Sequence, residues 1–382
     1  MAHRHVIGTI SRTMPDEDHD TPLDASPDSV TGPRGLPRIV WNADETAGGR
    51  VPKLVAPPPE WHDWSPLPAA DVVVFTWTTA EWEALHYVFL HDAVPLTEKP
   101  DDTTWQETWL PYRRDFYRVV QPLWTHRLVQ ARRNRAEGAP ALMREQLRWG
   151  SWVMMEVVGR RVLLFKSELH LNTDGETLPL VQLVRQVIED SGPALVLSTG
   201  TSWGVDPAHH LGDVVVTSSA RFHLGDELAS ERFNGETFAS SWHPPTSLAA
   251  RAEELMMPVR ELAVTPPTGH FQTGTRMEPV THSPRVVFSD LPILTTDFFE
   301  FGTTTNRLHE IGCCVEMDDA VVAMVCQELG VEFGFARNIS DPVINGELPP
   351  ALQRAWAVVT YRRRGLFTST NGALATWALV AA

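Results

Sequence analysis

Residues Ala194–Gly204 read ALVLSTGTSWG and join an apolar run to a turn that contains glycine. Four consecutive apolar residues, Ala194–Leu197, are typical of a strand buried on both faces of a sheet, with Ser198–Gly204 as the connection that follows. The stretch Asp71–Phe75 (DVVVF) has the same pattern and leads through Thr-rich turn residues into a helix over 80–90. Strands that alternate with helices indicate a layered α/β fold.

The same patterns predict further elements along the chain. Strands are expected to begin at Val153 and Val162 and to cover Asp213–Ser218 and Val331–Ala336, and helices are expected over 180–190, 319–329 and 350–361. Because ligands of α/β sheets bind at the carboxyl ends of the strands, we expect the functional residues there.

The 382 residues are expected to form a tail and one folded domain. Residues 1–67 are rich in Pro and Asp and lack periodicity, so we expect a largely disordered tail, part of which docks through Trp41, Trp61 and Trp64. Residues 68–382 form the domain, with a helical insertion over about 91–150 whose helical-looking segments are 105–120, 123–135 and 142–149.

Composition restricts the class of ligand. With 48 acidic and 32 basic residues the formal charge is −16, which repels phosphate backbones and anionic lipid headgroups. We therefore expect no nucleic-acid or membrane partner and a small-molecule substrate instead. The first residues lack the apolar core of a secretory signal, and three cysteines give no disulfide framework, so a cytoplasmic location is expected.

Four separated segments carry acidic, aromatic and small polar residues in a recognisable order. They are Thr76–Leu85 (TWTTAEWEAL), Ser198–Val216, Val315–Ala320 (VEMDDA) preceded by Thr296–Phe299, and Arg337–Asp341 (RNISD). Together they resemble the superfamily of purine nucleoside phosphorylases and methylthioadenosine/S-adenosylhomocysteine nucleosidases, over about residues 70–376. The resemblance implies a three-layer α/β/α fold of the phosphorylase/hydrolase-like type, with a central mixed twisted sheet, and an N-glycosyl hydrolase activity.

The resemblance assigns catalysis to Glu81, Asp341 and Arg337. Glu81 matches the acid that activates water, beside Arg337. Asp341 would protonate N7 of the departing purine, with Ser340 to orient it. A protonated aspartate at neutral pH requires burial or hydrogen bonding that raises its pKa.

Substrate-binding residues follow from the same resemblance. They are Thr201, Ser202, Phe299, Glu316, Met317, Asp318 and Ser340. Asp318 is expected to accept hydrogen bonds from the ribose hydroxyls, Met317 to pack on the sugar and Phe299 to stack on the base. The family has glutamate at the position of Asp318, so the ribose must lie closer or Asp319 must contribute. Trp203 replaces a glycine of the family.

Each motif also has a purely structural interpretation. A Gly-containing turn is often only a connection, Glu81 in a first helical turn complements the helix dipole, and Ser340-Asp341 can cap a helix near Pro342. Four such signals in the order of one family favour the enzyme.

The combined reading is a purine nucleosidase that hydrolyses an adenine nucleoside or nucleotide to free base and sugar. Phosphorylases of the family carry a Gly-Asp-Pro loop, which is Thr-Trp-Thr-Thr here, so water is preferred to phosphate as the nucleophile. The alternatives are a phosphate-dependent phosphorylase, an antiphage effector that degrades ATP or another nucleotide, and a nucleoside-binding sensor without turnover. Neither a cofactor nor a metal is implied, despite His209-His210 and His223.

Two further expectations concern the insertion and the assembly. Arg113 and Arg114, with the arginines at 118, 132, 133 and 135, would favour a 5′-phosphorylated substrate if they faced the ribose. The family resemblance and 14 tryptophans predict a homo-oligomer.

Overall fold

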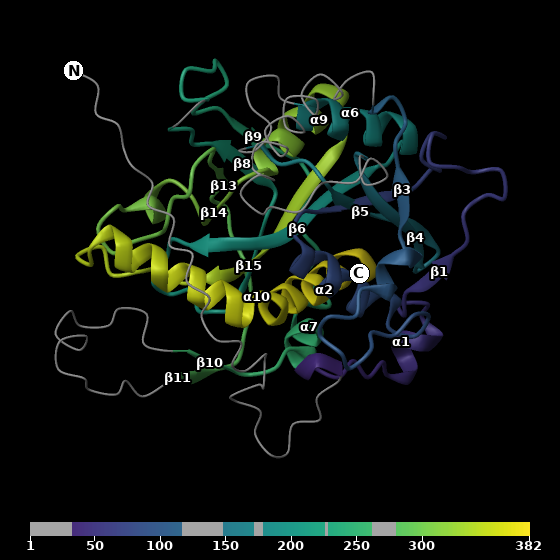
Figure 1. The fold of residues 1–382 in the computed structure, drawn as a ribbon, viewed down its shortest axis with the longest axis horizontal. Coiled ribbons are helices and arrows are strands. Elements are labelled where there is room, and N and C mark those ends of the chain that lie inside the picture. The colour runs from purple at the N-terminus through teal and green to yellow at the C-terminus, as the bar shows by residue number, and fades with distance from the viewer. Residues whose placement is uncertain (1–32, 117–147, 172–178, 226–227, 262–279) are drawn as a thin grey trace, which may run out of the picture.

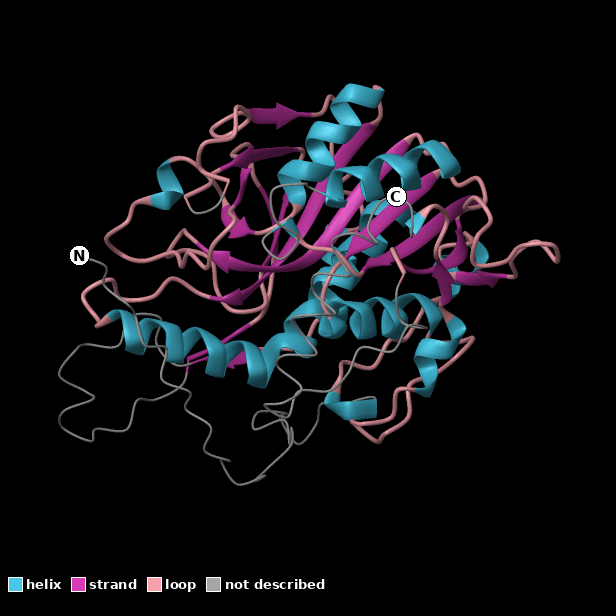
Figure 2. Cartoon of the chain, turned by 45° about the horizontal axis from the view of Figure 1, so that its top comes forward, coloured by secondary structure: helices cyan, strands magenta, loops and turns pink. Residues whose placement is uncertain are grey.

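The computed structural model describes residues 33–116, 148–171, 179–225, 228–261 and 280–382 (Figure 1). A large mixed sheet lies between two layers of helices, as expected for a three-layer α/β/α fold (Figures 1 and 2). The strands of this sheet are β1 (Lys53–Val55), β2 (Val72–Thr76), β3 (Leu110–Tyr112), β4 (Gly150–Val157), β5 (Arg160–Ser167), β6 (Leu195–Gly204), β7 (Val214–Thr217), β8 (Ser219–Phe222), β9 (Thr237–Ala239), β12 (Val286–Phe288), β13 (Ile293–Thr295), β14 (Cys314–Glu316) and β15 (Glu332–Asp341). A separate hairpin pairs β10 (Val259–Glu261) with β11 (Val280–His282).

The helices connect and cover these strands. They are α1 (Ala43–Ala47), α2 (Thr79–Leu90), α6 (Pro179–Ser191), α7 (Ala249–Leu255), α9 (Asp319–Leu329) and α10 (Pro350–Ala381), with 3-10 turns η1 (Pro33–Gly35), η2 (Thr104–Thr108) and η4 (Leu308–Glu310). α9 begins and ends at the predicted residues, and Gly330 in the left-handed region (φ 69°) terminates it.

Strand β2 shows why the sheet is covered on both faces. It runs parallel to β5 on one side and to β6 on the other. Val73 and Phe75 pack in the core cluster that contains α6 and α9, whereas Val72 and Val74 pack in the cluster that contains α2 and α10. Because successive side chains of a strand point to opposite faces, an unbroken apolar run requires helices on both.

Two strands are longer than predicted. Ser198–Gly204, predicted as a connection, continues β6, and β15 extends beyond the predicted Val331–Ala336 through Arg337–Asp341. The two segments stay extended because β6 and β15 pair in parallel from Leu195 and Glu332 onwards, and the end of β6 also pairs with β14. The helix-cap interpretation of Ser340-Asp341 is therefore wrong, since α10 begins only at Pro350.

From Pro33 onwards, the N-terminal part of the described chain packs against the domain. Leu36 and Ile39 are buried in the same core cluster as α2 and α10. The hydroxyl of Tyr87 in α2 donates to the carbonyl of Pro37 at 2.8 Å, and the Trp41 ring lies 4.8 Å from that of Trp377. Residues 1–32 lie outside the described part of the chain.

The insertion differs from its predicted helical form where it is described. Residues 105–120 were expected as a helix, but η2 and β3 occupy Thr104–Thr108 and Leu110–Tyr112. β3 adds to the edge of the sheet beside β4, and the edge tolerates Pro111, which has no N–H to donate. The segment expected at 123–135 and most of that at 142–149 lie outside the described residues.

In the described ranges, no helix combines the length and apolar content needed to cross a lipid bilayer.

Candidate functional site

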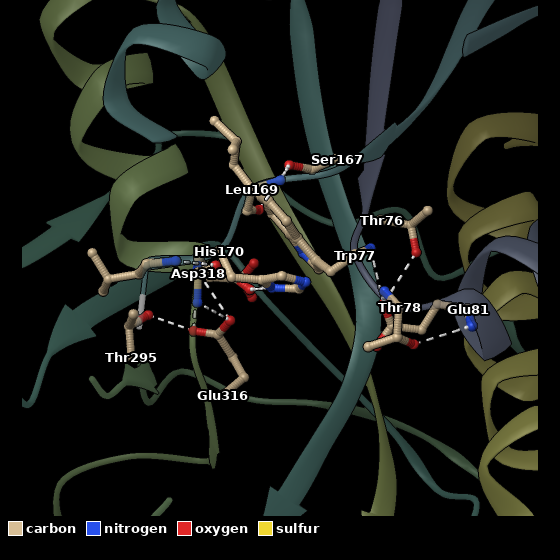
Figure 3. Close-up of polar contacts among 12 residues, drawn as sticks. Thr76, Trp77, Thr78, Glu81, Ser167, Leu169, His170, Thr295, Glu316 and Asp318 are labelled. Atoms are coloured by element: carbon tan, nitrogen blue, oxygen red, sulfur yellow. Dashed lines mark hydrogen bonds and ion pairs between the residues drawn. The ribbon is translucent and has the colours of Figure 1, made fainter. Parts of the chain in front are cut away.

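Glu81 is buried at the start of α2, where β2 ends. Thr78 caps this helix, and Glu81 completes a reciprocal capping box with it. Oε2 of Glu81 accepts hydrogen bonds from Trp77 N at 2.9 Å, Thr78 N at 2.8 Å and Thr76 Oγ1 at 3.3 Å (Figure 3). One oxygen of Glu81 thus ties the start of α2 to the end of β2.

The other carboxylate oxygen of Glu81 binds β6. Oε1 accepts from Thr201 N at 2.7 Å and from Thr201 Oγ1 at 2.8 Å. The neighbouring Gly200 has no room for a side chain, because a Cβ there would lie 2.7 Å from Oε1 of Glu81 and 2.6 Å from Nη1 of Arg337. Described residues thus donate five hydrogen bonds to the carboxylate of Glu81, which hold it as a fixed acceptor.

Arg337, in β15, is buried and pairs with Asp319 through two nitrogens. Its Nε donates to Asp319 Oδ2 at 2.8 Å and its Nη2 to Asp319 Oδ1, while Nη2 also donates to Ser198 Oγ at 3.0 Å. Burial alone would lower the pKa of Arg337, but Asp319 and Glu316 outweigh it and raise the pKa. Nη2 of Arg337 also lies 3.1 Å from Glu316 Oε2, so the guanidinium lies between two buried acidic residues, Asp319 and Glu316.

Glu316 supports the start of α9. Its Oε2 accepts from Asp318 N at 2.6 Å and Asp319 N at 3.0 Å, and its Oε1 accepts from the hydroxyl of Thr295 (Figure 3). Burial, together with the neighbouring Asp319, raises the pKa of Glu316 to about 8. The geometry gives Glu316 a role in positioning Asp318 and Asp319, whereas the sequence placed it among the substrate-binding residues.

Asp318 is held on both of its oxygens by the segment that follows β5. Oδ1 accepts from Leu171 N at 3.0 Å, and Oδ2 lies 3.1 Å from Nδ1 of His170 (Figure 3). Met317 beside it is half-buried. Only 4% of the Asp318 side chain is exposed against 30% of the His170 side chain, so the imidazole is the more accessible partner.

His170 also lies near the Glu81 side of the site. Its ring centroid is 6.0 Å from that of Trp77. Burial lowers the pKa of His170, but the carboxylates of Asp318 and Glu81 outweigh this effect and raise it. Sequence reasoning missed His170; the available signal was a histidine shortly after the β5 strand, on the edge where the other polar residues meet.

Asp341 ends β15 and has an unusual environment for a carboxyl group. Ser340 Oγ donates to its Oδ2 at 2.7 Å, and Oδ1 is buried with no hydrogen-bond partner among the described residues. Burial raises the pKa of Asp341 to about 7. An unpaired buried carboxyl oxygen that holds a proton near neutral pH is suited to donate it to a ligand.

Thr201 and Ser202 do not share a face of β6. Thr201 points to Glu81, whereas the hydroxyl of Ser202 is buried and donates to the carbonyl of Asn338 at 3.2 Å. Successive side chains of a strand point to opposite faces, so Ser202 points away from Glu81.

Aromatic residues gather next to the end of β6. Trp203 packs edge-on against Phe299 and Phe301, with ring centroids 5.7 Å apart in both pairs, and Phe299 is 67% exposed. Trp203 also pairs with Asp341 across the two strands. The indole ring of Trp203 therefore packs against Phe299 next to the end of β15, where Asp341 lies.

Tyr361 brings α10 to the site. Its hydroxyl donates to Thr78 Oγ1 at 3.3 Å. Burial raises the pKa of Tyr361 to about 12, with further contributions from Glu81 and Asp341. No sequence motif marks this residue, because its position depends on how α10 packs against α2.

The insertion arginines that are described have carboxylate partners. Arg113 Nε lies 3.1 Å from Asp63 Oδ2, and Arg114 pairs with Asp190. Arg118 and the arginines at 132, 133 and 135 lie outside the described residues. Where the chain is described, no group of three His, Cys, Asp or Glu side chains could hold a metal ion.

The chain is similar to a protein family, to a curated relative and to several solved structures. The sequence model of the Phosphorylase superfamily matches residues 155–355. The 5′-methylthioadenosine/S-adenosylhomocysteine nucleosidase of Bacillus cytotoxicus is 27% identical over 197 residues, which cover 48% of this chain and 70% of that protein. Solved structures that resemble the chain include the same kind of nucleosidase from Neisseria meningitidis in complex with methylthio-immucillin-A, with 16% identity, a TM-score of 0.44, and coverage of 81% of this chain and 98% of that one. The futalosine hydrolase of Helicobacter pylori has 15% identity, a TM-score of 0.43, and coverage of 81% and 96%.

Proposed function

Because the chain belongs to the Phosphorylase superfamily, we propose that it is a purine nucleosidase that hydrolyses an N-glycosidic bond. The substrate is an adenine nucleoside or nucleotide, and the products are the free base and the sugar. The observation that carries this proposal is the contrast between two buried carboxyl groups. Five donors hold Glu81 as an acceptor, whereas one oxygen of Asp341 has no hydrogen-bond partner in the described part of the chain and the pKa of Asp341 is raised to about 7.

Asp341 is the general acid of the proposed reaction. Cleavage of the bond leaves an electron-rich purine and an oxocarbenium-like sugar, so protonation of the leaving base lowers the barrier. The proton passes from Oδ1 to N7 of the base, while Ser340 keeps its hydrogen bond to Oδ2. Phe299 and Trp203 lie on this side of the site, where the base would stack.

Glu81 holds the water. Its Oε1 receives two hydrogen bonds from Thr201 and can accept one more from a water molecule, whose proton it then takes as the water attacks the sugar. A fixed carboxylate at this position also repels the anionic phosphate that a phosphorylase would need. Hydrolysis is therefore the proposed reaction, and phosphorolysis is the alternative.

Asp318 and Met317 form the sugar side of the proposed site. The carboxylate of Asp318 accepts hydrogen bonds from the ribose hydroxyls, as the family resemblance implies. The choice of adenine rests on the relative from Bacillus cytotoxicus, which is named for two adenine-containing substrates. Since Arg113 and Arg114 already pair with Asp63 and Asp190, a nucleoside is preferred to a 5′-phosphorylated nucleotide.

Base release tests the proposal. The purified protein is incubated with methylthioadenosine, adenosylhomocysteine, adenosine, AMP and ATP, with and without phosphate, and adenine is measured by chromatography. Release of adenine without phosphate is expected. A strict requirement for phosphate would make the protein a phosphorylase, and ligand-induced thermal stabilisation without any turnover would make it a binding module.

A further inference from the structure

His170 lies outside the motifs that identify the family, yet it contacts the carboxylate assigned to the ribose. We propose that His170 is a positioning residue that fixes Asp318 for the ribose 2′- and 3′-hydroxyls and so makes the enzyme selective for ribonucleosides over 2′-deoxyribonucleosides. This inference rests on the proposed function and names the sugar that the site accepts.

The short side chain of Asp318 explains why such a residue is needed. The family has glutamate at this position, and aspartate reaches one methylene less far. A shorter carboxylate can bind both hydroxyls of a ribose only if both of its oxygens are oriented toward them. Each oxygen of Asp318 is oriented by its own donor, Leu171 N for Oδ1 and His170 Nδ1 for Oδ2. A carboxylate oxygen can accept two or three hydrogen bonds, as Oε2 of Glu81 does, so each oxygen of Asp318 retains capacity for a hydroxyl.

The segment that carries the two donors, His170 and Leu171, is itself held by hydrogen bonds. Ser167, the last residue of β5, is fully buried, and its hydroxyl donates to the carbonyl of Leu169 at 2.8 Å while accepting from Leu169 N at 3.0 Å (Figure 3). This closed turn sets the direction in which His170 and Leu171 leave the strand. The arrangement therefore preorganises Asp318 before substrate binds, which avoids the entropy cost of ordering it later.

Charges around His170 strengthen the contact. Asp318 at the start of α9 and Glu81 in α2 are negative, whereas Lys166 in β5 is positive and pairs with Glu168 at 2.9 Å. The two carboxylates favour the imidazolium form. Its hydrogen bond to Asp318 is then charge-assisted, which makes it stronger than a bond between neutral groups.

The test compares His170→Leu, which removes the donor, with His170→Asn, whose amide nitrogen can replace Nδ1. Steady-state kinetics and calorimetric binding are measured with adenosine and 2′-deoxyadenosine. For His170→Leu we expect KM and Kd for adenosine to rise about 10- to 100-fold, the typical effect of losing a hydrogen bond to a charged group, with kcat changed much less. The values for 2′-deoxyadenosine should change little, and His170→Asn should restore the preference for adenosine.

A matched control is His309→Leu, an exposed histidine in η4, which should behave as wild type. Thermal melts confirm that each variant is folded. If the wild type turns over both nucleosides and His170→Leu keeps the wild-type preference, the inference fails while the proposed function stands. If no base is released but His170→Leu still removes selective adenosine binding, the inference stands and the hydrolase proposal fails. Absence of both turnover and selective binding overturns both.

Discussion

Burial gives Asp341 a protonation equilibrium close to neutral pH, since its pKa is raised to about 7. A general acid must be protonated, so kcat should be constant below pH 7 and fall about tenfold per pH unit above it. Asp341→Asn should lower kcat by about 10²–10⁴-fold, and the remaining activity should no longer fall as the pH rises above 7. Rates of adenine release from pH 5 to 9 check both expectations. An Asn variant with normal turnover would contradict the assignment.

The same residue should affect stability with a definite sign. Because the folded pKa of about 7 exceeds the unfolded value of 3.8, the native state binds more protons between these values and stability falls as pH rises through this range. Asp341→Asn removes this dependence. Relative to wild type, the variant should gain up to about 4 kcal/mol in the free energy of unfolding between pH 4 and pH 8. Urea melts at several pH values measure it, and parallel curves for the two proteins would refute it.

Glu81 combines catalytic and structural roles, so its amide variant should be impaired in both. Glutamine has one acceptor oxygen in place of two, and its NH₂ group would face donors from Trp77 and Thr78 or from Thr201. Glu81→Gln should abolish hydrolysis and lower the free energy of unfolding by about 1–3 kcal/mol. Activity assays and denaturant melts measure this, with the exposed Glu310→Gln as the control. Full activity in Glu81→Gln would exclude Glu81 as the base.

At the scale of elements, β6 contains two glycines that should respond differently to alanine. A Cβ at Gly200 would lie within 2.7 Å of both Arg337 and Glu81, which are held by several hydrogen bonds and cannot move cheaply. A Cβ at Gly204 would meet Ile339 at 3.3 Å, a tight but tolerable contact. Gly200→Ala should lower kcat by at least about tenfold, while Gly204→Ala should stay near wild type. Equal kinetics of the two variants would contradict the crowding at Gly200.

The sequence predicts the bounds of one helix correctly and those of another only in part. It placed both ends of α9, because apolar spacing starts at Asp319 and a glycine follows Leu329. It ended α10 at Tyr361, whereas the helix continues to Ala381. The run Thr368–Gly372 is a poor helix former by composition, and the bond from Thr370 Oγ1 to the carbonyl of Leu366 does not favour a helix, but the side chains of Thr368–Asn371 are buried. Tertiary packing, which composition does not record, keeps this run helical.

In the candidate site, too, the sequence indicates some residues and not the contacts between them. Motifs located Glu81, Arg337, Asp341 and Asp318, because family resemblance fixes residue types at positions. They did not reveal that Asp319 pairs with Arg337, or that His170 holds Asp318 from a distance of 148 residues along the chain. Such contacts depend on the pairing of strands and on the direction of turns. Residue order alone does not determine them.

For the whole molecule, the N-terminal segment should contribute to stability. Leu36 is 1% exposed and packs in the core, whereas the nearby Val40 is 56% exposed. Leu36→Ala should lower the free energy of unfolding by about 2–5 kcal/mol, while Val40→Ala should change it little. Denaturant melts of the two variants provide the comparison. Equal stability would mean that the segment does not contribute to the core in solution.

The assembly implied by the family resemblance stays a prediction. Phe299 packs against Trp203 and yet is 67% exposed in the single chain. A second copy that covered this ring would remove apolar surface from water, so we expect a homo-oligomer. Light scattering at micromolar concentration measures the mass, and a value near 42.7 kDa would contradict the expectation.

The bond between Glu81 and the amide of Thr201 joins segments 120 residues apart in sequence. That amide proton is held by a buried carboxylate on the neighbouring β2–α2 unit, so it can exchange with solvent only when this unit separates from β6. The same separation removes the carboxylate proposed to hold the water. Hydrogen exchange at this one amide therefore measures how often a molecule opens into a form that cannot catalyse, without any substrate present.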